Sequence, residues 1–272
     1  MIERKIPKYL LWYSWFRLMF FHMTSQSFDR GYTNAFTSAM VPILRFLYKG
    51  REDADQEIRD GLKRTRSYYL CEQSFSGIAF AIIVGMEEKR ANGQPISGEA
   101  IAATRTSIIG PMSGLGDTIH GSTTRQLSVA LTIPFCLAGN WHSALWMLGL
   151  LNISPLLVAL LGVPQGYKNG SAFVLTLVKS GFIQKITPVI SAFYMVLFGA
   201  IAAKYSPWFL QNMYGQNISN RTISVVLVAF LILCFYISLI KKIKLMYIFG
   251  SCLTLGIFLA LIKILSSFSH WF

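Results

Sequence analysis

The feature that most constrains this chain is the absence of acidic side chains from its second half. From Thr118 to Phe272 it contains no aspartate or glutamate, while ten basic residues are spread along this part. Uncharged stretches lie between them, at residues 126–167, 186–203, 222–240 and 245–262. A helix needs about 20 predominantly apolar residues to cross a bilayer, so each stretch suits one crossing and the first suits two. The pattern predicts a hydrophobic membrane region over residues 126–272, built from transmembrane or re-entrant helices.

The composition excludes several other classes of protein. Charged residues make up 14% of the chain and hydrophobic residues 53%, whereas about 25% of the residues of a soluble domain are charged. An ordinary soluble domain and a disordered chain are therefore excluded. The four cysteines are far apart and lie in or beside apolar stretches, which predicts buried free thiols and excludes a disulfide-built module. The net charge of +13 does not indicate nucleic-acid binding, because basic groups between uncharged stretches are typical of a membrane protein.

The first 125 residues have a different character, since all twelve acidic residues lie at or before Asp117. Residues 6–21 combine aromatic side chains with two basic residues, which is typical of a helix in the membrane interface; a soluble amphipathic helix is the alternative. Residues 51–72 predict a solvated, highly charged helix. Residues 73–86 are apolar but too short for a full crossing, which favours a buried or re-entrant helix.

The predicted fold class is therefore an all-α membrane protein with two regions. Residues 1–125 form interfacial and cytoplasmic-side helices, and residues 126–272 form the hydrophobic membrane region, with a turn at Gly139-Asn140. Lysines flank the later uncharged stretches, at positions 168, 179, 185, 241, 242 and 244. The positive-inside rule then places the N-terminus and both lysine-bearing loops in the cytoplasm, and residues 205–221 and the C-terminus outside.

The densest run of glycine and hydroxyl side chains is residues 110–125, immediately before the longest uncharged stretch. Irregular backbone at membrane depth is tolerated where it is buried in protein or lines a cavity, and transporters place polar ligand sites in such segments. Asp117 is the last carboxylate of the chain and is therefore a candidate site residue, with Arg125 as its candidate ion partner. The alternative is that Asp117 caps the start of a helix while Arg125 lies at the lipid headgroups.

Three further side chains have chemistry suited to a site. His120 is a candidate phosphate acceptor or proton carrier, or else a hydrogen-bonded polar group in a turn. Glu72 and Gln73 place a carboxylate beside an amide, and each can bind sugar hydroxyls with two hydrogen bonds; a helix-end pair facing water is the alternative. Residues 114–116 lack the pattern of a nucleotide loop, and no Cys or His residues have metal-ligand spacing. We expect no nucleotide, metal or other cofactor, and no catalytic residue.

These segments resemble enzyme IID, the D subunit of mannose–fructose–sorbose phosphotransferase permeases. Residues 40–48 (MVPILRFLY) are similar to the family's M-x-P-x-L…L-Y segment, and residues 86–93 (MEEKRANG) to its M-E-E-x-x-A-N-G. Residues 110–119 (GPMSGLGDTI) are similar to its strongest signature, G-P-x-A-G-I-G-D-x-x. The resemblance covers residues 20–205. The chain departs from the pattern at residues 68–71 (YYLC), where family members usually read F-F-N-T, and at His120-Gly121, where many read Trp-Gly.

The resemblance implies a membrane subunit of a phosphoenolpyruvate-dependent sugar permease. In this family the C and D subunits form the sugar pathway, and cytoplasmic A and B subunits deliver phosphate to the incoming sugar. It implies a bacterial inner-membrane location, membrane lipid as surroundings and multimers of C/D pairs. We expect Asp117, Thr118 and His120 to line or shape the sugar path, with Glu72 and Gln73 second. One alternative is a subunit that braces the C subunit and docks the B subunit without touching sugar. The other is a membrane transferase that uses His120 as a phosphate acceptor.

Overall fold

The computed structural model describes residues 3–214 and, beyond them, Tyr236, Lys241, Gly250 and Thr254. The chain divides into two compact units, Met1–Leu197 and Phe198–Phe272, and the site lies in the first. The described residues contain helices and two isolated bridges but no strand. Apart from Tyr236, Gly250 and Thr254, the expected crossings at 222–240 and 245–262 lie outside the described residues, and the division at residue 125 stays a prediction.

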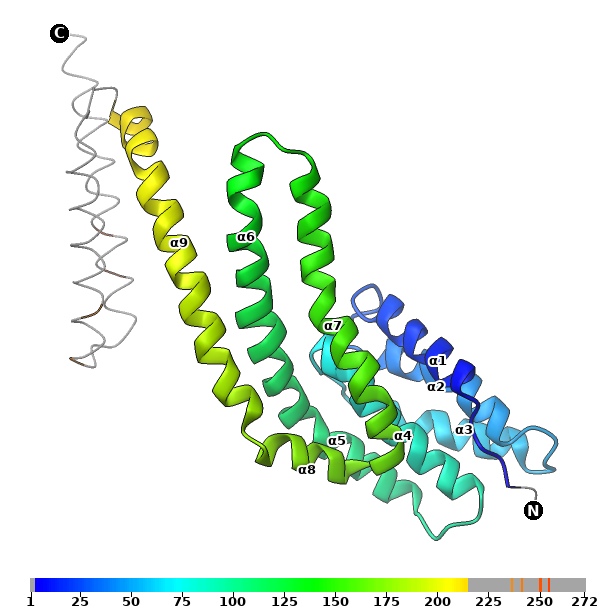
Figure 1. Cartoon of the computed structure of the whole chain (residues 1–272). Coiled ribbons are helices and arrows are strands. Elements are labelled where there is room, and N and C mark those ends of the chain that lie inside the picture. The colour runs from blue at the N-terminus through cyan, green and yellow to red at the C-terminus, as the bar shows by residue number, and fades with distance from the viewer. Residues whose placement is uncertain (1–2, 215–235, 237–240, 242–249, 251–253, 255–272) are drawn as a thin grey trace. The chain divides into compact units, whose positions relative to one another are not determined.

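The helices follow one another with short connections (Figure 1). In chain order they are α1 (Lys8–Phe21), α2 (Thr33–Leu47), α3 (Ala54–Arg64), α4 (Gln73–Ala91), α5 (Gly98–Gly116), the π-helix η1 (Asp117–Thr124), α6 (Arg125–Leu137), α7 (His142–Asn169), α8 (Ser171–Lys179) and α9 (Phe182–Tyr214). The charged helix expected over 51–72 is confirmed but shorter, because the chain bends after Arg64 and Tyr69 bridges to Gly31.

The centre of the first unit is α4. It contacts α1, α2, α5 and α7, and most of its side chains are buried, including every residue from Ser74 to Gly85. A helix that is apolar on all sides belongs in a core. The prediction of a buried helix over residues 73–86 is therefore confirmed, and the helix continues for one more turn to the polar residues at its C-terminal end.

Glycines allow α7 to lie directly against α4. A Cβ atom at Gly166 would come within 3.0 Å of the Ile78 carbonyl oxygen, and one at Gly162 within 2.7 Å of Ile78 Cγ1. On the other helix, a Cβ atom at Gly85 would come within 2.8 Å of the Tyr167 carbonyl oxygen. Small residues spaced four apart permit the same close approach between helices in membranes. This close contact sets the position of α7 on the core.

The acidic pair Glu87-Glu88 at the end of α4 stabilises the fold. Glu87 is fully buried and accepts two hydrogen bonds from the Arg64 guanidinium, at 2.8 and 3.0 Å. Burial works to lower the pKa of Arg64, but the hydrogen bonds and charge of Glu87 raise it above its ordinary value. Glu88 accepts from the Ile6 amide and the Tyr167 hydroxyl, both at 2.5 Å. Residues 86–93 therefore join α3, α7 and the N-terminal segment to α4.

The α6–α7 pair forms the predicted helical hairpin (Figure 1). Its turn contains Gly139, whose φ of +76° suits glycine. The helices α7 and α9 include the segments His142–Asn169 and Phe182–Tyr205, which are long and apolar enough to cross a membrane. Leu145, Leu148 and Leu161 are among the exposed apolar side chains of α7. A bilayer would cover such a surface.

The helix expected over residues 6–21 is α1, which buries one face against the core and exposes aromatic side chains on the other. Leu11, Ser14 and Leu18 are buried against the core. Tyr9, Tyr13, Phe16 and Phe20 are all more than half exposed, and their spacing puts them on one face. That an interface of lipid headgroups covers this aromatic face stays a prediction.

The close contact between α4 and α7 generates a stability prediction. We expect Gly166→Val to lower the free energy of unfolding by about 1–3 kcal/mol, because the added side chain would press on the Ile78 backbone. Thermal melting of the purified protein in detergent measures the effect. Gly149→Val is the matched control, since Gly149 lies on the same helix with open space around its Cβ position. Equal melting temperatures for the two variants would contradict this account of the packing.

Candidate functional site

The site begins at the first turn of α4, which Glu72 caps. Its carboxylate accepts hydrogen bonds from the backbone amides of Ser74 and Phe75, at 2.8 and 3.2 Å, and from the Ser74 hydroxyl at 3.1 Å. These bonds satisfy amides that lack a partner inside the helix, and the negative charge stabilises the helix N-terminus. The interpretation of Glu72 as a residue at a helix end is confirmed, but its carboxylate binds backbone rather than facing only water.

Gly116 brings the two predicted site segments together. It is buried at the end of α5, and a Cβ atom there would overlap the Glu72 carboxylate. Glycine is therefore required for the close approach of the Glu72 side chain to the helix. The approach places the start of α4 beside the start of η1, where Asp117 lies. The glycine-rich motif thus provides room for a carboxylate from another helix.

The segment 117–124 is a π-helix and not the broken backbone that its glycines and hydroxyl groups suggest. The Ser122 hydroxyl donates to the Asp117 carbonyl at 3.1 Å, and the Thr123 hydroxyl donates to the Thr118 carbonyl at 2.7 Å. Because α5, η1 and α6 are continuous, Asp117 lies inside a helix and makes no cap bond. The alternative of a helix start at Asp117 is therefore wrong. Short π-helical segments inside α-helices are frequent at functional sites.

A pocket of about 340 Å³ opens where α1, α4, η1, α6 and α7 meet. We call it the site pocket. Its His120 ring places Nδ1 3.1 Å from the Ser154 hydroxyl oxygen on α7. Apolar side chains supply most of its wall, with amide, imidazole, indole and guanidinium groups among them. The lining residues are Trp15, Met19, Gln73, His120, Arg125, Leu151, Asn152, Pro155 and Leu156.

The predicted site residues separate into two groups in the structure. Gln73 and His120 line the site pocket, and Glu72 interacts electrostatically with His120. Asp117 and Thr118 are not among the lining residues, and the Thr118 hydroxyl donates to the Gly114 carbonyl of its own helix at 2.8 Å. Within the described part of the chain no ion pair joins Asp117 to Arg125.

Sequence reasoning missed three contributors to the site. Trp15 comes from α1 and leaves its indole N–H buried without a hydrogen-bond partner among the described residues. Asn152 and Ser154 come from α7, as the pocket amide and the partner of His120. The two polar residues on α7 stand within a long uncharged stretch, and polar groups at such depth are often functional. No local signal in the sequence singles out Trp15.

The residues beneath Glu72 are deeply buried. Burial raises the pKa of the Cys71 thiol to about 12, so the thiol stays protonated and unreactive. His22 is fully buried, and its ring packs at a tilt against Tyr32, with 4.0 Å between the ring centroids. Burial lowers the pKa of His22 to about 4, despite an opposing contact with the Cys71 backbone. The neutral imidazole is therefore part of the packing under the site.

Comparison with protein families gives one match over nearly the whole chain. The family described as the PTS system mannose/fructose/sorbose family IID component matches residues 5–265. The chain is 28% identical over 182 residues to the mannose-specific EIID component of Escherichia coli K12, covering 67% of this chain and 63% of that protein. It is 26% identical over 186 residues to the sorbose-specific EIID component of Lacticaseibacillus casei, covering 68% and 64%. The chain thus matches just under two thirds of these relatives' length.

A solved structure shares the fold. The cryo-EM structure of the mannose transporter ManYZ with microcin E492 contains a chain that matches with a TM-score of 0.56 and 24% identity. The match covers 94% of this chain and 96% of the other. This likeness confirms the predicted all-α membrane-protein fold class.

The buried neutral His22 generates a prediction on pH. Its pKa is about 4 in the folded protein and about 6.5 when unfolded, so the unfolded state binds the extra proton as pH falls. Stability is fully present above pH 6.5 and is lost towards pH 4. Between pH 7 and pH 5 we expect this residue to lower the free energy of unfolding by about 2 kcal/mol.

The test compares unfolding at several pH values for the parent protein and His22→Phe, which should show a shallower fall. His142→Phe is the control, because His142 is exposed and also stacks on an aromatic neighbour, Trp141. An unchanged pH slope in the His22 variant would show that another group titrates.

Proposed function

Because the chain belongs to the IID components of the mannose/fructose/sorbose family of the phosphotransferase system, we propose that it is the D-type membrane subunit of a bacterial sugar permease. Relatives named as mannose-specific and sorbose-specific components are 28% and 26% identical to it. The family therefore supports a sugar as the transported substrate but does not name one. Specificity between similar sugars depends on a few pocket contacts.

In the proposed complex, this chain and a C-type membrane subunit together form the sugar pathway. A cytoplasmic B subunit phosphorylates the sugar as it enters, with phosphate supplied through an A subunit, and C/D pairs assemble into multimers. The likeness to a chain of the ManYZ transporter structure supports a membrane partner. This chain binds and guides the sugar and takes no phosphate itself.

The proposed membrane location also follows from membership of this family. The protein lies in the bacterial inner membrane, with α7 and α9 as described helices able to cross it. We place the N-terminus in the cytoplasm, because Lys168 near the end of α7, Lys179 on α8 and Lys185 near the start of α9 cluster around the connection of the two helices. The same rule places the C-terminus outside.

The observation that carries the sugar-binding proposal is the meeting of Gln73, His120 and Trp15 in one pocket. An amide can donate to one sugar hydroxyl and accept from another. The Trp15 ring adds an apolar surface against which a sugar can pack, while its N–H is buried next to Gly77. His120, already oriented towards Ser154, supplies a further polar group. Glu72 positions the start of α4 and hence Gln73, while Asp117 and Thr118 shape the wall around η1.

One observation favours the alternative of a bracing subunit that never contacts sugar. The Glu72 carboxylate and the Thr118 hydroxyl already have partners in the fold. Both therefore serve local structure, and a pathway built mainly by the C-type subunit would need nothing more from them. Gln73 separates the two proposals, because its amide lines the site pocket.

The test is sugar uptake and phosphoenolpyruvate-dependent phosphorylation in cells that co-express this chain with its C, B and A partners. We expect Gln73→Ala to reduce uptake by about tenfold, because losing a hydrogen bond to a buried ligand costs about 1–2 kcal/mol. Gln126→Ala is the matched control, since Gln126 is exposed and outside the pocket lining. Normal uptake with Gln73→Ala at equal protein level would support the bracing role.

Asp117→Asn, in the same cells, tests the residue that the sequence analysis named first as a candidate for lining the sugar path. We expect reduced uptake if the carboxylate shapes the path, and unchanged uptake at equal protein level would remove Asp117 from the site.

Phosphate labelling of the purified chain with an active carrier cascade tests the transferase alternative. If the chain is labelled and His120→Asn abolishes the labelling, His120 is a phosphate acceptor. This result would overturn the proposal that the chain takes no phosphate itself.

A further inference from the structure

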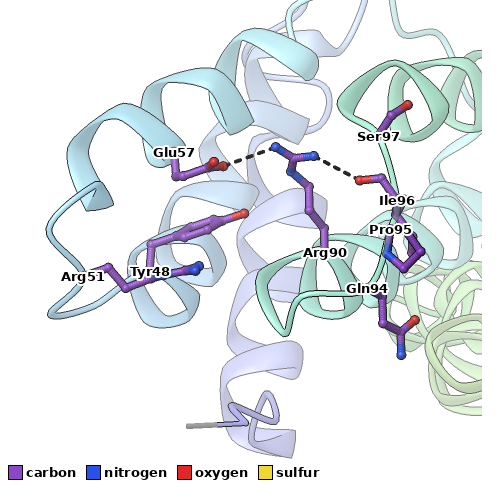
Figure 2. Close-up of a pocket in the computed structure, with 8 residues that line it drawn as sticks. All are labelled: Tyr48, Arg51, Glu57, Arg90, Gln94, Pro95, Ile96 and Ser97. Carbon is purple, nitrogen blue, oxygen red and sulfur yellow. Dashed lines mark hydrogen bonds and ion pairs between the residues drawn. The ribbon is translucent and has the colours of Figure 1, made fainter. Parts of the chain in front are cut away.

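A second pocket lies among the most charged segments of the chain. It is a groove of about 420 Å³ between the end of α2, the start of α3, the end of α4 and the loop before α5 (Figure 2). It shares no lining residue with the site pocket. The residues that line it are Tyr48, Arg51, Glu57, Arg90, Gln94, Pro95, Ile96 and Ser97.

Three buried polar atoms of the groove make no hydrogen bond within the described part of the chain. They are Tyr48 Oη, Glu57 Oε2 and Arg90 Nε. Tyr48 is only 1% exposed, and its hydroxyl points towards the Arg90 side of the groove (Figure 2). A buried polar group without a partner costs about 1–3 kcal/mol. Three such groups at one groove point to a ligand that bonds them together.

Arg90 is held in place at the centre of the groove. One terminal nitrogen of its guanidinium donates to the Ile96 carbonyl at 3.0 Å. The other lies 3.6 Å from the Glu57 carboxylate, which is an ion pair longer than a hydrogen bond (Figure 2). The side chain is thereby oriented while its Nε–H remains a donor. A planar guanidinium fixed in this way suits an oxyanion.

The charges and donors of the groove favour an anion. Arg51 and Arg90 provide two positive charges, and Glu57 provides one negative charge. The Arg51 guanidinium lies over the Tyr48 ring, 5.4 Å from its centroid, and also pairs with Asp53 at 3.6 Å. Burial, with the charges of Glu87 and Glu57, raises the pKa of Tyr48. Tyr48 therefore keeps its proton and acts as a donor.

The Glu57 carboxylate is a hydrogen-bond acceptor, and it determines which anion the groove can bind. We propose that this groove binds inorganic hydrogen phosphate. Its oxygens accept from Tyr48 Oη–H and Arg90 Nε–H, in the field of Arg51, and its own O–H donates to Glu57. Near neutral pH inorganic phosphate carries at least one proton and sulfate carries none. Glu57 therefore selects phosphate, because sulfate would leave the carboxylate facing an anion without a hydrogen bond.

The experiment measures binding of inorganic phosphate and of sulfate to the full chain in nanodiscs, by calorimetric titration at matched ionic strength and neutral pH. We expect phosphate to bind at least tenfold more tightly than sulfate and to raise the melting temperature. Equal affinities for the two anions, or no binding of phosphate, would overturn the proposal. A sugar-uptake defect from the site pocket has no bearing on this result, since the two pockets share no residue.

Tyr48→Phe removes only the hydroxyl and keeps the ring under Arg51. We expect it to fold with unchanged or higher stability without phosphate, because an unpartnered buried hydroxyl is gone, and to bind phosphate about tenfold more weakly. Tyr13→Phe is the matched control, on the exposed face of α1. Phosphate affinity unchanged by Tyr48→Phe would remove this hydroxyl from the site and contradict the proposed geometry.

Glu57→Gln tests the selection between anions. An amide can donate to sulfate as well as accept from hydrogen phosphate, so we expect the preference for phosphate to fall to less than threefold. Glu52→Gln is the matched control, because it makes the same charge change at an exposed position nearby. A preference retained in the Glu57 variant would show that Glu57 does not select the anion.

Discussion

The close packing of α7 on α4 is the contact on which the rest of the first unit depends. Gly162 and Gly166 bring the α7 backbone against Ile78, which places Ser154 opposite His120 and Tyr167 within reach of Glu88. A larger side chain at either glycine would move α7 outwards and separate both pairs. In a lipid-facing protein such contacts replace much of the hydrophobic driving force that water gives to a soluble core. Both the shape of the site pocket and the anchoring of the N-terminal segment follow from this approach.

Three carboxylates of the N-terminal half stabilise the fold through hydrogen bonds to other parts of the chain. Glu72 caps α4, Glu87 pairs with Arg64 and Glu88 holds the Ile6 amide. Each is buried or half-buried and bonded to donors that would otherwise be unsatisfied, so its removal would leave a buried donor unpaired. Part of the motif pattern that marks this family is thus explained by local structure. A motif that carries family membership is therefore weak evidence, by itself, for contact with substrate.

Much of the fold could be predicted from the sequence, since it depends on local signals. Ser97 caps α5 by accepting from Ala100, and Gly139 makes the hairpin turn, as residue types at such positions indicate. The residues of the site pocket were harder to predict from the sequence. Two hydroxyl groups of the π-helix donate to carbonyls five residues earlier, one residue beyond the α-helical spacing, and no apolar pattern encodes this spacing. Trp15 reaches the pocket only through the packing of α1 on α4, a contact between segments far apart in the sequence.

The two pockets lie at opposite ends of α4. Gln73 begins the helix at the site pocket, and Arg90, one residue before its end, lines the groove proposed to bind phosphate. At 1.5 Å per residue the two positions are about 25 Å apart, so ligands in the two pockets do not touch. Any influence of one on the other has to pass along α4, whose neighbours hold it on several sides. Closely packed interiors transmit strain, so the buried stretch of α4 from Ser74 to Gly85 is the physical connection that the two pockets share.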